Sequence, residues 1–237
     1  MIARLIWKEW VEQRWKLALC CVLLVGFSAA GLRARVAADL AVCVLAAFGG
    51  CLLLPIFVGM DLLASERAEG SLISLLALPV SSHKILAVKL LIGCGTIVGY
   101  MLAACTTICL MAGGREIETG RIISLFAGCT GVGVALLIWM TCLAVRQVSE
   151  ARCAVVGIVV LVVWVFTMFG FDFLGSFFMG GWSPPKWLPV IHPVALLEAS
   201  QSSWHWSIVA VGIQVLWVVL LFLWAASRLG RMEGPQR

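Results

Sequence analysis

The chain has 237 residues, of which 62% are hydrophobic and only 12% carry a charge, with a formal net charge of +5. Soluble domains are close to half apolar and a quarter charged, so this composition excludes a water-soluble globule and predicts an integral membrane protein without a soluble catalytic domain. Most lysine and arginine residues stand at the ends of apolar stretches, which is typical of membrane topology and argues against a nucleic-acid partner.

Residues 1–16 are predicted to form an amphipathic elbow helix that lies in the membrane interface. On a helical wheel the charged side chains fall on one side, and isoleucine, valine and tryptophan side chains fall on the other. The alternative is a secretory signal peptide, because Ser28-Ala29-Ala30 resembles a cleavage site. Two glutamates and several tryptophans favour the interfacial helix. The charged side consists of Arg4, Lys8, Glu9, Glu12 and Lys16.

Six apolar stretches follow, and each has about the length of a membrane-spanning helix. They predict an all-α fold in which residues 17–237 form a six-span transmembrane domain. Lysine and arginine divide 12 to 5 between the two sides of this arrangement, which places both termini in the cytoplasm. A bacterial inner membrane is the expected location. The predicted spans are residues 17–32, 40–60, 85–112, 122–145, 153–171 and 207–226.

Ionisable residues are absent from the middles of these stretches. Asp61 and Asp172 fall at span ends, and Lys89 is near enough to an end for its ammonium group to snorkel to the interface. Ion-driven transporters and channels usually need charged groups at depth, so the pattern favours a lipid-like or amphipathic substrate moved by an external energy source. The ten cysteines all lie in or beside apolar stretches, where they serve as small packing residues.

Catalytic and nucleotide-binding motifs are also missing from the sequence. There is no HExxH pair, no GxSxG elbow and no GxxxxGK[ST] phosphate loop. An intramembrane enzyme is therefore disfavoured, no cofactor or metal is expected, and the chain is not expected to bind ATP itself.

The loop over residues 61–84 is the most informative segment. Charged residues come first, Gly70 then permits a bend, and Ser71 can cap a short helix that Pro79 ends. Ser81 or Ser82 caps the next helix. The loop therefore presents a short apolar helix flanked by charges, which suits either docking into a partner protein or resting on the membrane surface.

The stretch from Ser65 through Glu66, Gly70 and Leu-Pro79-Val-Ser-Ser to Lys89 resembles the inner loop of ABC-2 type transporter permeases. Their pattern E-x-x-x-G-T-L, followed by L-P-[VI]-S-[RS], joins the second and third spans. Ser71 and Ser82 depart mildly from it. The opening Leu5-Ile-Trp-Lys-Glu-Trp also resembles the family's elbow helix.

The resemblance implies a transport subunit whose motor is a separate ABC ATP-binding subunit, with two permease chains forming a dimer in the lipid bilayer. Residues 61–84 would then be the cytoplasmic coupling loop. By position in the motif, the residues coupled to the ATPase would be Glu66, Arg67, Glu69, Gly70, Leu72, Leu75, Leu76 and Pro79.

The outer segment, residues 172–206, contains four prolines and four tryptophans. The resemblance implies a pair of re-entrant short helices here, whereas the residues alone also fit an aromatic loop at the headgroups. Two other functions stay open: a membrane scaffold or assembly protein that transports nothing, and a haem-maturation type of ABC permease, for which His192 and His205 are the candidate outer ligands.

Overall fold

The computed structural model describes residues 2–33, 39–68, 70, 81–111, 119–147, 149, 151–163 and 204–233. Every regular element in these ranges is helical, so the predicted all-α class is confirmed. The elements are α1 (Ile2–Arg33), α2 (Asp39–Met60), the π-helix η1 (Asp61–Ser65), α3 (Glu66–Ala68), α5 (Ser82–Met111), α6 (Thr119–Ala144), a helix over Ala151–Val163, and α10 (Trp204–Glu233).

Three helices contain apolar stretches long enough to cross a membrane. These stretches are Ser82–Leu110 in α5, Phe126–Ala144 in α6 and Val211–Leu229 in α10, and they coincide with the predicted third, fourth and sixth spans. Shorter apolar helical stretches cover Gly49–Ala64 and Ala151–Val163. The six-span count stays a prediction, because the second half of the fifth span and most of the outer segment lie outside the described residues.

The N-terminal segment differs from the sequence-based expectation. Helix α1 continues from Ile2 to Arg33 without a break at residue 16, so residues 2–16 are part of a longer helix, and their position in the membrane interface stays a prediction. No proline precedes Pro55, so no proline interrupts this helix. Glu9 and Gln13 are each only 1% exposed, which means that this part of α1 packs against the bundle.

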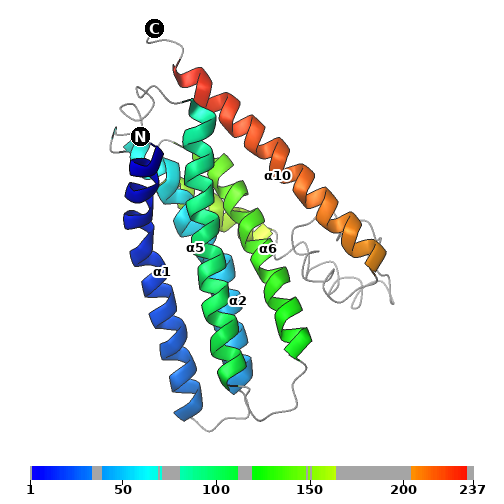
Figure 1. Ribbon diagram of the computed structural model, residues 1–237. Helices are drawn as coiled ribbons and strands as arrows, with labels where there is room; N and C mark the ends of the chain where they lie inside the picture. The colour runs from blue at the N-terminus through cyan, green and yellow to red at the C-terminus, as the bar shows by residue number, and fades with distance from the viewer. Residues whose placement is uncertain are drawn as a thin grey trace.

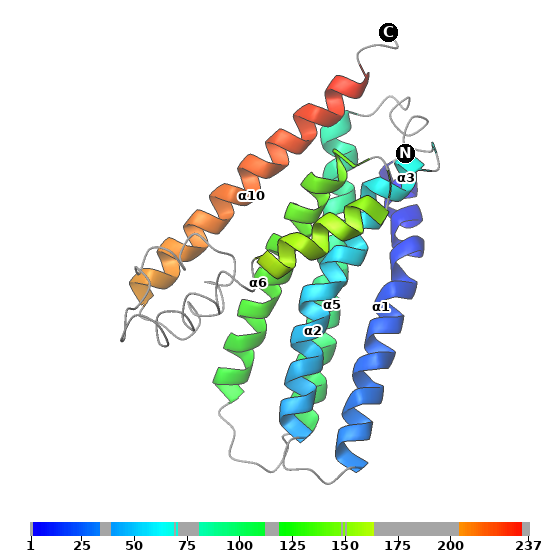
Figure 2. The same cartoon turned by 180° about the vertical axis from the view of Figure 1, so that it is seen from behind.

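The helices α1, α2, α5 and α6 run side by side, whereas α10 crosses the bundle at a slant (Figures 1 and 2). The start of α1 and the end of α10 lie at the same end of the molecule (Figure 1), which we call the terminal end. Leucine, isoleucine and cysteine side chains from all five helices form one core. The large apolar side chains of α10 are mostly exposed, as expected where lipid is the solvent.

Helix α2 does not stop where the predicted second span ends. Its backbone passes through the π-helix η1 into α3, which ends at Ala68, and Gly70 has a φ of +73°. The Gly70 N–H donates to the carbonyl of Arg67 (3.2 Å). A left-handed φ is accessible to glycine without a steric penalty, so the predicted bend at Gly70 is confirmed.

Candidate functional site

A cluster of charged side chains lies between helices at the terminal end of the bundle. Lys8 and Glu9 come from the first three turns of α1, Glu66 begins α3, and Lys89 lies two turns into α5. We call these four residues the charge cluster. Glu9 and Lys89 are each 1% exposed and Glu66 is 4% exposed, so three of the four charges are inside the protein.

Lys89 is the centre of the cluster. Its Nζ donates to Glu9 Oε1 at 2.6 Å and lies 2.9 Å from Glu66 Oε2. One ammonium group therefore joins α1 to α3 from a position on α5. The expectation that Lys89 snorkels to the interface is wrong, because two buried carboxylates hold its charge inside the bundle.

Lys8 completes the cluster from its exposed side. Its Nζ donates to Glu66 Oε1 at 2.8 Å and lies 3.6 Å from Glu12, one helical turn further along α1. Glu9 and Glu66 carry two negative charges, and Lys8 and Lys89 carry two positive ones. This balance matters because an unpaired buried charge is strongly unfavourable.

Burial and pairing act in opposite directions on these groups. Burial raises the pKa of the Glu9 carboxyl group, and the charge of Lys89 opposes the rise without cancelling it. Burial alone would lower the pKa of Lys8, but its hydrogen bond to Glu66 and the surrounding carboxylates outweigh burial and raise it. Lys8 therefore stays charged, whereas the charge of Glu9 depends on Lys89.

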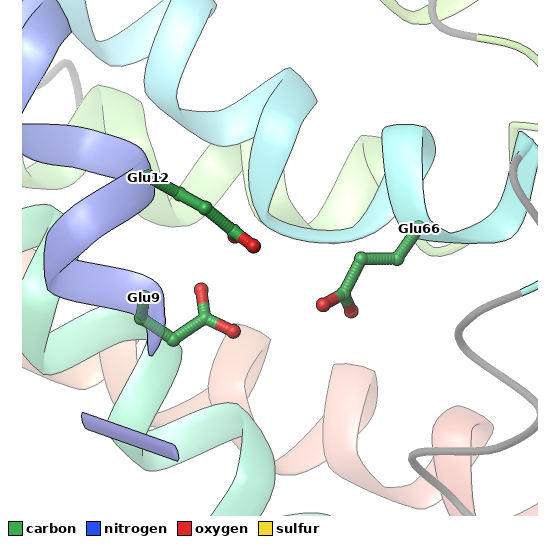
Figure 3. A group of neighbouring side chains, drawn as sticks. All are labelled: Glu9, Glu12 and Glu66. Atoms are coloured by element: carbon green, nitrogen blue, oxygen red, sulfur yellow. The ribbon is translucent and has the colours of Figure 1, made fainter. Parts of the chain in front are cut away.

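Three carboxylates approach one another at the cluster, a spacing that would also permit a metal site. Glu9 and Glu12 on α1 and Glu66 on α3 point toward a common space (Figure 3), and one oxygen from each lies within 4.8 Å of the others. Lys8 and Lys89 already contact these carboxylates and supply the positive charge that a metal ion would bring. We therefore describe the group as an ion-pair cluster.

A second set of polar contacts lies one turn deeper. Gln13 Nε2 donates to Asp61 Oδ2 at 2.9 Å, and Lys16 forms an ion pair with the same carboxylate. Asp61 is the first residue of the π-helix η1, and Glu66 directly follows its last residue. Side chains of α1 therefore contact the chain at both ends of η1. π-turns are often found at functional positions.

Arg67 links the same segment to another helix. Its Nη1 donates to the backbone carbonyls of Val145 (2.9 Å) and Gln147 (3.0 Å), which directly follow α6. The last carbonyls of a helix have no intrahelical donor, so a guanidinium group is a suitable partner. The neighbouring residues Glu66 and Arg67 thus bind α1, α5 and the end of α6.

The predicted coupling residues divide into two groups. The structure brings Glu66 and Arg67 into the bundle and places Gly70 at the exposed turn that follows. At the far end of the loop, the backbone carbonyl of Ser81 accepts hydrogen bonds from the backbone N–H groups of Lys84 and Ile85, and α5 begins at the next residue. The other predicted coupling residues lie outside the described part of the chain: Glu69, Leu72, Leu75, Leu76 and Pro79.

The amphipathic pattern of residues 1–16 predicts an outward polar side for Lys8, Glu9 and Lys16 and does not predict the cluster. The signal was present in the spacing of Glu9, Gln13, Leu17, Cys20 and Leu24, which repeats every three or four residues and runs along one face of a helix. That face is the one packed inward. The polar residues at its start were read as solvent-facing because their partners on α3 and α5 are distant in sequence.

Comparison with known proteins identifies the family. A search of curated proteins finds no match. The family model described as ABC-2 family transporter protein matches residues 14–170, which is more than half of the chain. This range includes most of α1 and the segment 61–67. It also includes α5 and α6, which this segment contacts at Lys89 and at the end of α6. The chain is an integral membrane protein that belongs to the ABC-2 family of transporter proteins, the membrane permeases of ABC transporters.

Proposed function

We propose that this chain is the permease subunit of an ATP-driven exporter, energised by a separate ATP-binding subunit that docks on residues 61–84. Two copies would form the transport path, with both termini and the docking loop in the cytoplasm. The substrate would be amphipathic or lipid-like, in keeping with the apolar middles of the spans.

The observation that supports this proposal best is the set of bonds at the start of the loop. Glu66 binds Lys8 on α1 and Lys89 on α5, and Arg67 binds the backbone that follows α6. A force applied to the loop would therefore act on three helices through short polar contacts. A connector that only rested on the membrane surface would not need such bonds.

The two residues would have different parts in coupling. Glu66 is buried and contacts two lysines, so it would fix the base of the loop and would not itself touch an ATPase. Arg67 is partly exposed and would transmit movement to the end of α6. The apolar side chains of Leu72 and Leu75 would then be the docking residues, as the resemblance implies.

Docking is tested by purifying the tagged chain from its native membrane in mild detergent and identifying what is bound. An ABC ATPase should co-purify in stoichiometric amount and be lost from the double variant Leu72→Asp/Leu75→Asp. Ala3→Asp is the control for an added aspartate, because it introduces one negative charge at an exposed position of the terminal end, outside the loop. If the wild-type protein stays a single folded species and no ATPase co-purifies with it, the scaffold function is favoured instead.

Coupling is tested separately with Arg67→Ala. This variant should still bind the ATPase, because the docking leucines are intact, but the ATP-dependent change in distance between labels on α1 and α6 should fall to less than half. The measurement is pulsed spin-label spectroscopy on the reconstituted complex, with Arg14→Ala as a control for removal of an exposed arginine. Unchanged distances in Arg67→Ala would remove this residue from the coupling path.

A further inference from the structure

A pair of arginines meets a single tryptophan at the terminal end of the bundle. The guanidinium carbon of Arg146 lies 4.9 Å from the ring centroid of Trp224, and that of Arg228 lies 5.8 Å from the same centroid. Arg146 follows α6, whereas Trp224 and Arg228 belong to the last turns of α10. Two segments distant in sequence thus bring two positive charges to one indole ring.

Among the described residues, no carboxylate forms an ion pair with either arginine. The ion pairs of the described residues involve Lys8, Lys16 and Lys89, and none includes Arg146 or Arg228. Both arginines are exposed. Two guanidinium groups near one ring repel each other, and an anion that contacts both would offset that repulsion. Arginine suits phosphate in particular, because its planar fork donates two parallel hydrogen bonds.

The arrangement is held by the backbone. Arg67 donates to the carbonyls of Val145 and Gln147, so the residues on both sides of Arg146 are fixed. Arg228 lies one helical turn from Trp224 on α10 and needs no loop to position it. The guanidinium groups are therefore presented from ordered backbone on two different elements.

The location matches a lipid headgroup. Trp224 and Arg228 lie near the end of the apolar stretch Val211–Leu229, and Arg146 comes two residues after the apolar stretch that ends at Ala144. Membrane phosphates lie at this depth, and tryptophan is enriched there. Leu220 and Leu223, one turn further into α10, are 50% and 52% exposed and offer an apolar surface for acyl chains.

We propose that Arg146, Trp224 and Arg228 form a binding site for the phosphate of one anionic phospholipid, whose acyl chains lie along α10. Basic pockets between membrane helices are suited to anionic headgroups. This site would be separate from the charge cluster and would not depend on the identity of the ATPase or of the substrate.

The test is native mass spectrometry of the full chain in detergent, titrated with phosphatidylglycerol or with phosphatidylcholine of the same acyl composition. Wild-type protein should bind one phosphatidylglycerol in preference to phosphatidylcholine. In Arg146→Gln/Arg228→Gln this preference should fall roughly tenfold or more, because charge-assisted hydrogen bonds are lost. Millimolar inorganic phosphate should not displace the lipid, since it lacks acyl chains to contact α10.

Two further variants show whether a changed preference comes from the site. Arg14→Gln also removes an exposed arginine stacked on a tryptophan, Trp15 at 5.9 Å, and should keep the wild-type preference. Arg146→Lys/Arg228→Lys keeps both charges but loses the planar forks, so its preference should be intermediate. The proposal is wrong if the double glutamine variant binds phosphatidylglycerol like wild type, if Arg14→Gln loses as much, or if inorganic phosphate displaces the lipid.

Discussion

Lys89 places a charged ammonium group inside the protein. Its ammonium group is 1% exposed and is shared by two buried carboxylates on different helices. Bringing such groups out of water is unfavourable, and their mutual attraction offsets this only when every charge is paired. The cluster therefore contributes more to the position of Glu66 than to net stability, and removing one member should have a larger effect than removing a matched pair.

Replacing Lys89 should be the most destabilising single change in the cluster. Lys89→Met leaves Glu9 without its ion-pair partner and should lower the free energy of unfolding by about 3–5 kcal/mol. The double variant Glu9→Gln/Lys89→Met should recover part of this loss, because the buried charge of Glu9 is removed with its partner. Thermal unfolding in detergent measures both effects.

The control for this comparison is Lys84→Met. Lys84 stands on the same helix but is exposed, so its replacement should change stability by no more than about 0.5 kcal/mol. If Lys89→Met were as mild as Lys84→Met, the cluster would have no structural importance.

At the scale of the helices, close packing depends on glycines that no sequence motif identifies. A Cβ at Gly59 on α2 would lie 2.6 Å from Cβ of Met140 on α6, whereas at Gly95 on α5 it would have nothing within 4 Å. The GxxxG pair Gly95 and Gly99 therefore does not make the tightest approach, although it has the familiar spacing. Spacing alone indicates that two helices can approach closely, but the facing partner decides whether they do.

Gly59→Ala should consequently separate α2 from α6. Because the clash is with a Cβ atom, which a rotamer change cannot move, we expect a loss of about 1–3 kcal/mol and a lower yield of monodisperse protein. Gly95→Ala should be neutral or slightly stabilising, since alanine favours the helix and the space is open. Size-exclusion profiles after a heating series measure the difference, and equal midpoints for the two variants would contradict the assigned α2–α6 contact.

At the scale of the whole molecule, the start of α1 and the end of α10 lie at one end of the bundle (Figure 1). The charge cluster and the Arg146–Trp224–Arg228 group lie at this end as well. The terminal end therefore contains both the contacts of Glu66 and Arg67 with three helices and the two arginines beside α10. An even number of membrane crossings would place the two termini in this way.

Topology can be measured directly with fusions of a fluorescent protein and of a periplasm-dependent phosphatase. Following the excess of lysine and arginine, both termini should be cytoplasmic, so either terminal fusion should fluoresce and neither should show phosphatase activity. A phosphatase fusion after Arg115, in the predicted outer turn, should be active. Activity at a terminus would reverse the predicted orientation and remove the loop at 61–84 from the side where ATP is available.

The membrane class, the positions of the long apolar helices, the bend at Gly70 and the family could be predicted from the sequence, because these depend on local composition, helical length and a contiguous motif. Three features came from the packed helices alone: Glu9, Glu66 and Lys89 meet, Arg67 binds the end of α6, and α1 continues as one helix packed inward. Those contacts join residues that are 23 to 80 positions apart, and the sequence near a charged residue at a helix end is the same whether that residue faces water or a buried partner. The physical reason is that periodicity identifies the face of a helix, whereas the partner of that face depends on how the helices pack.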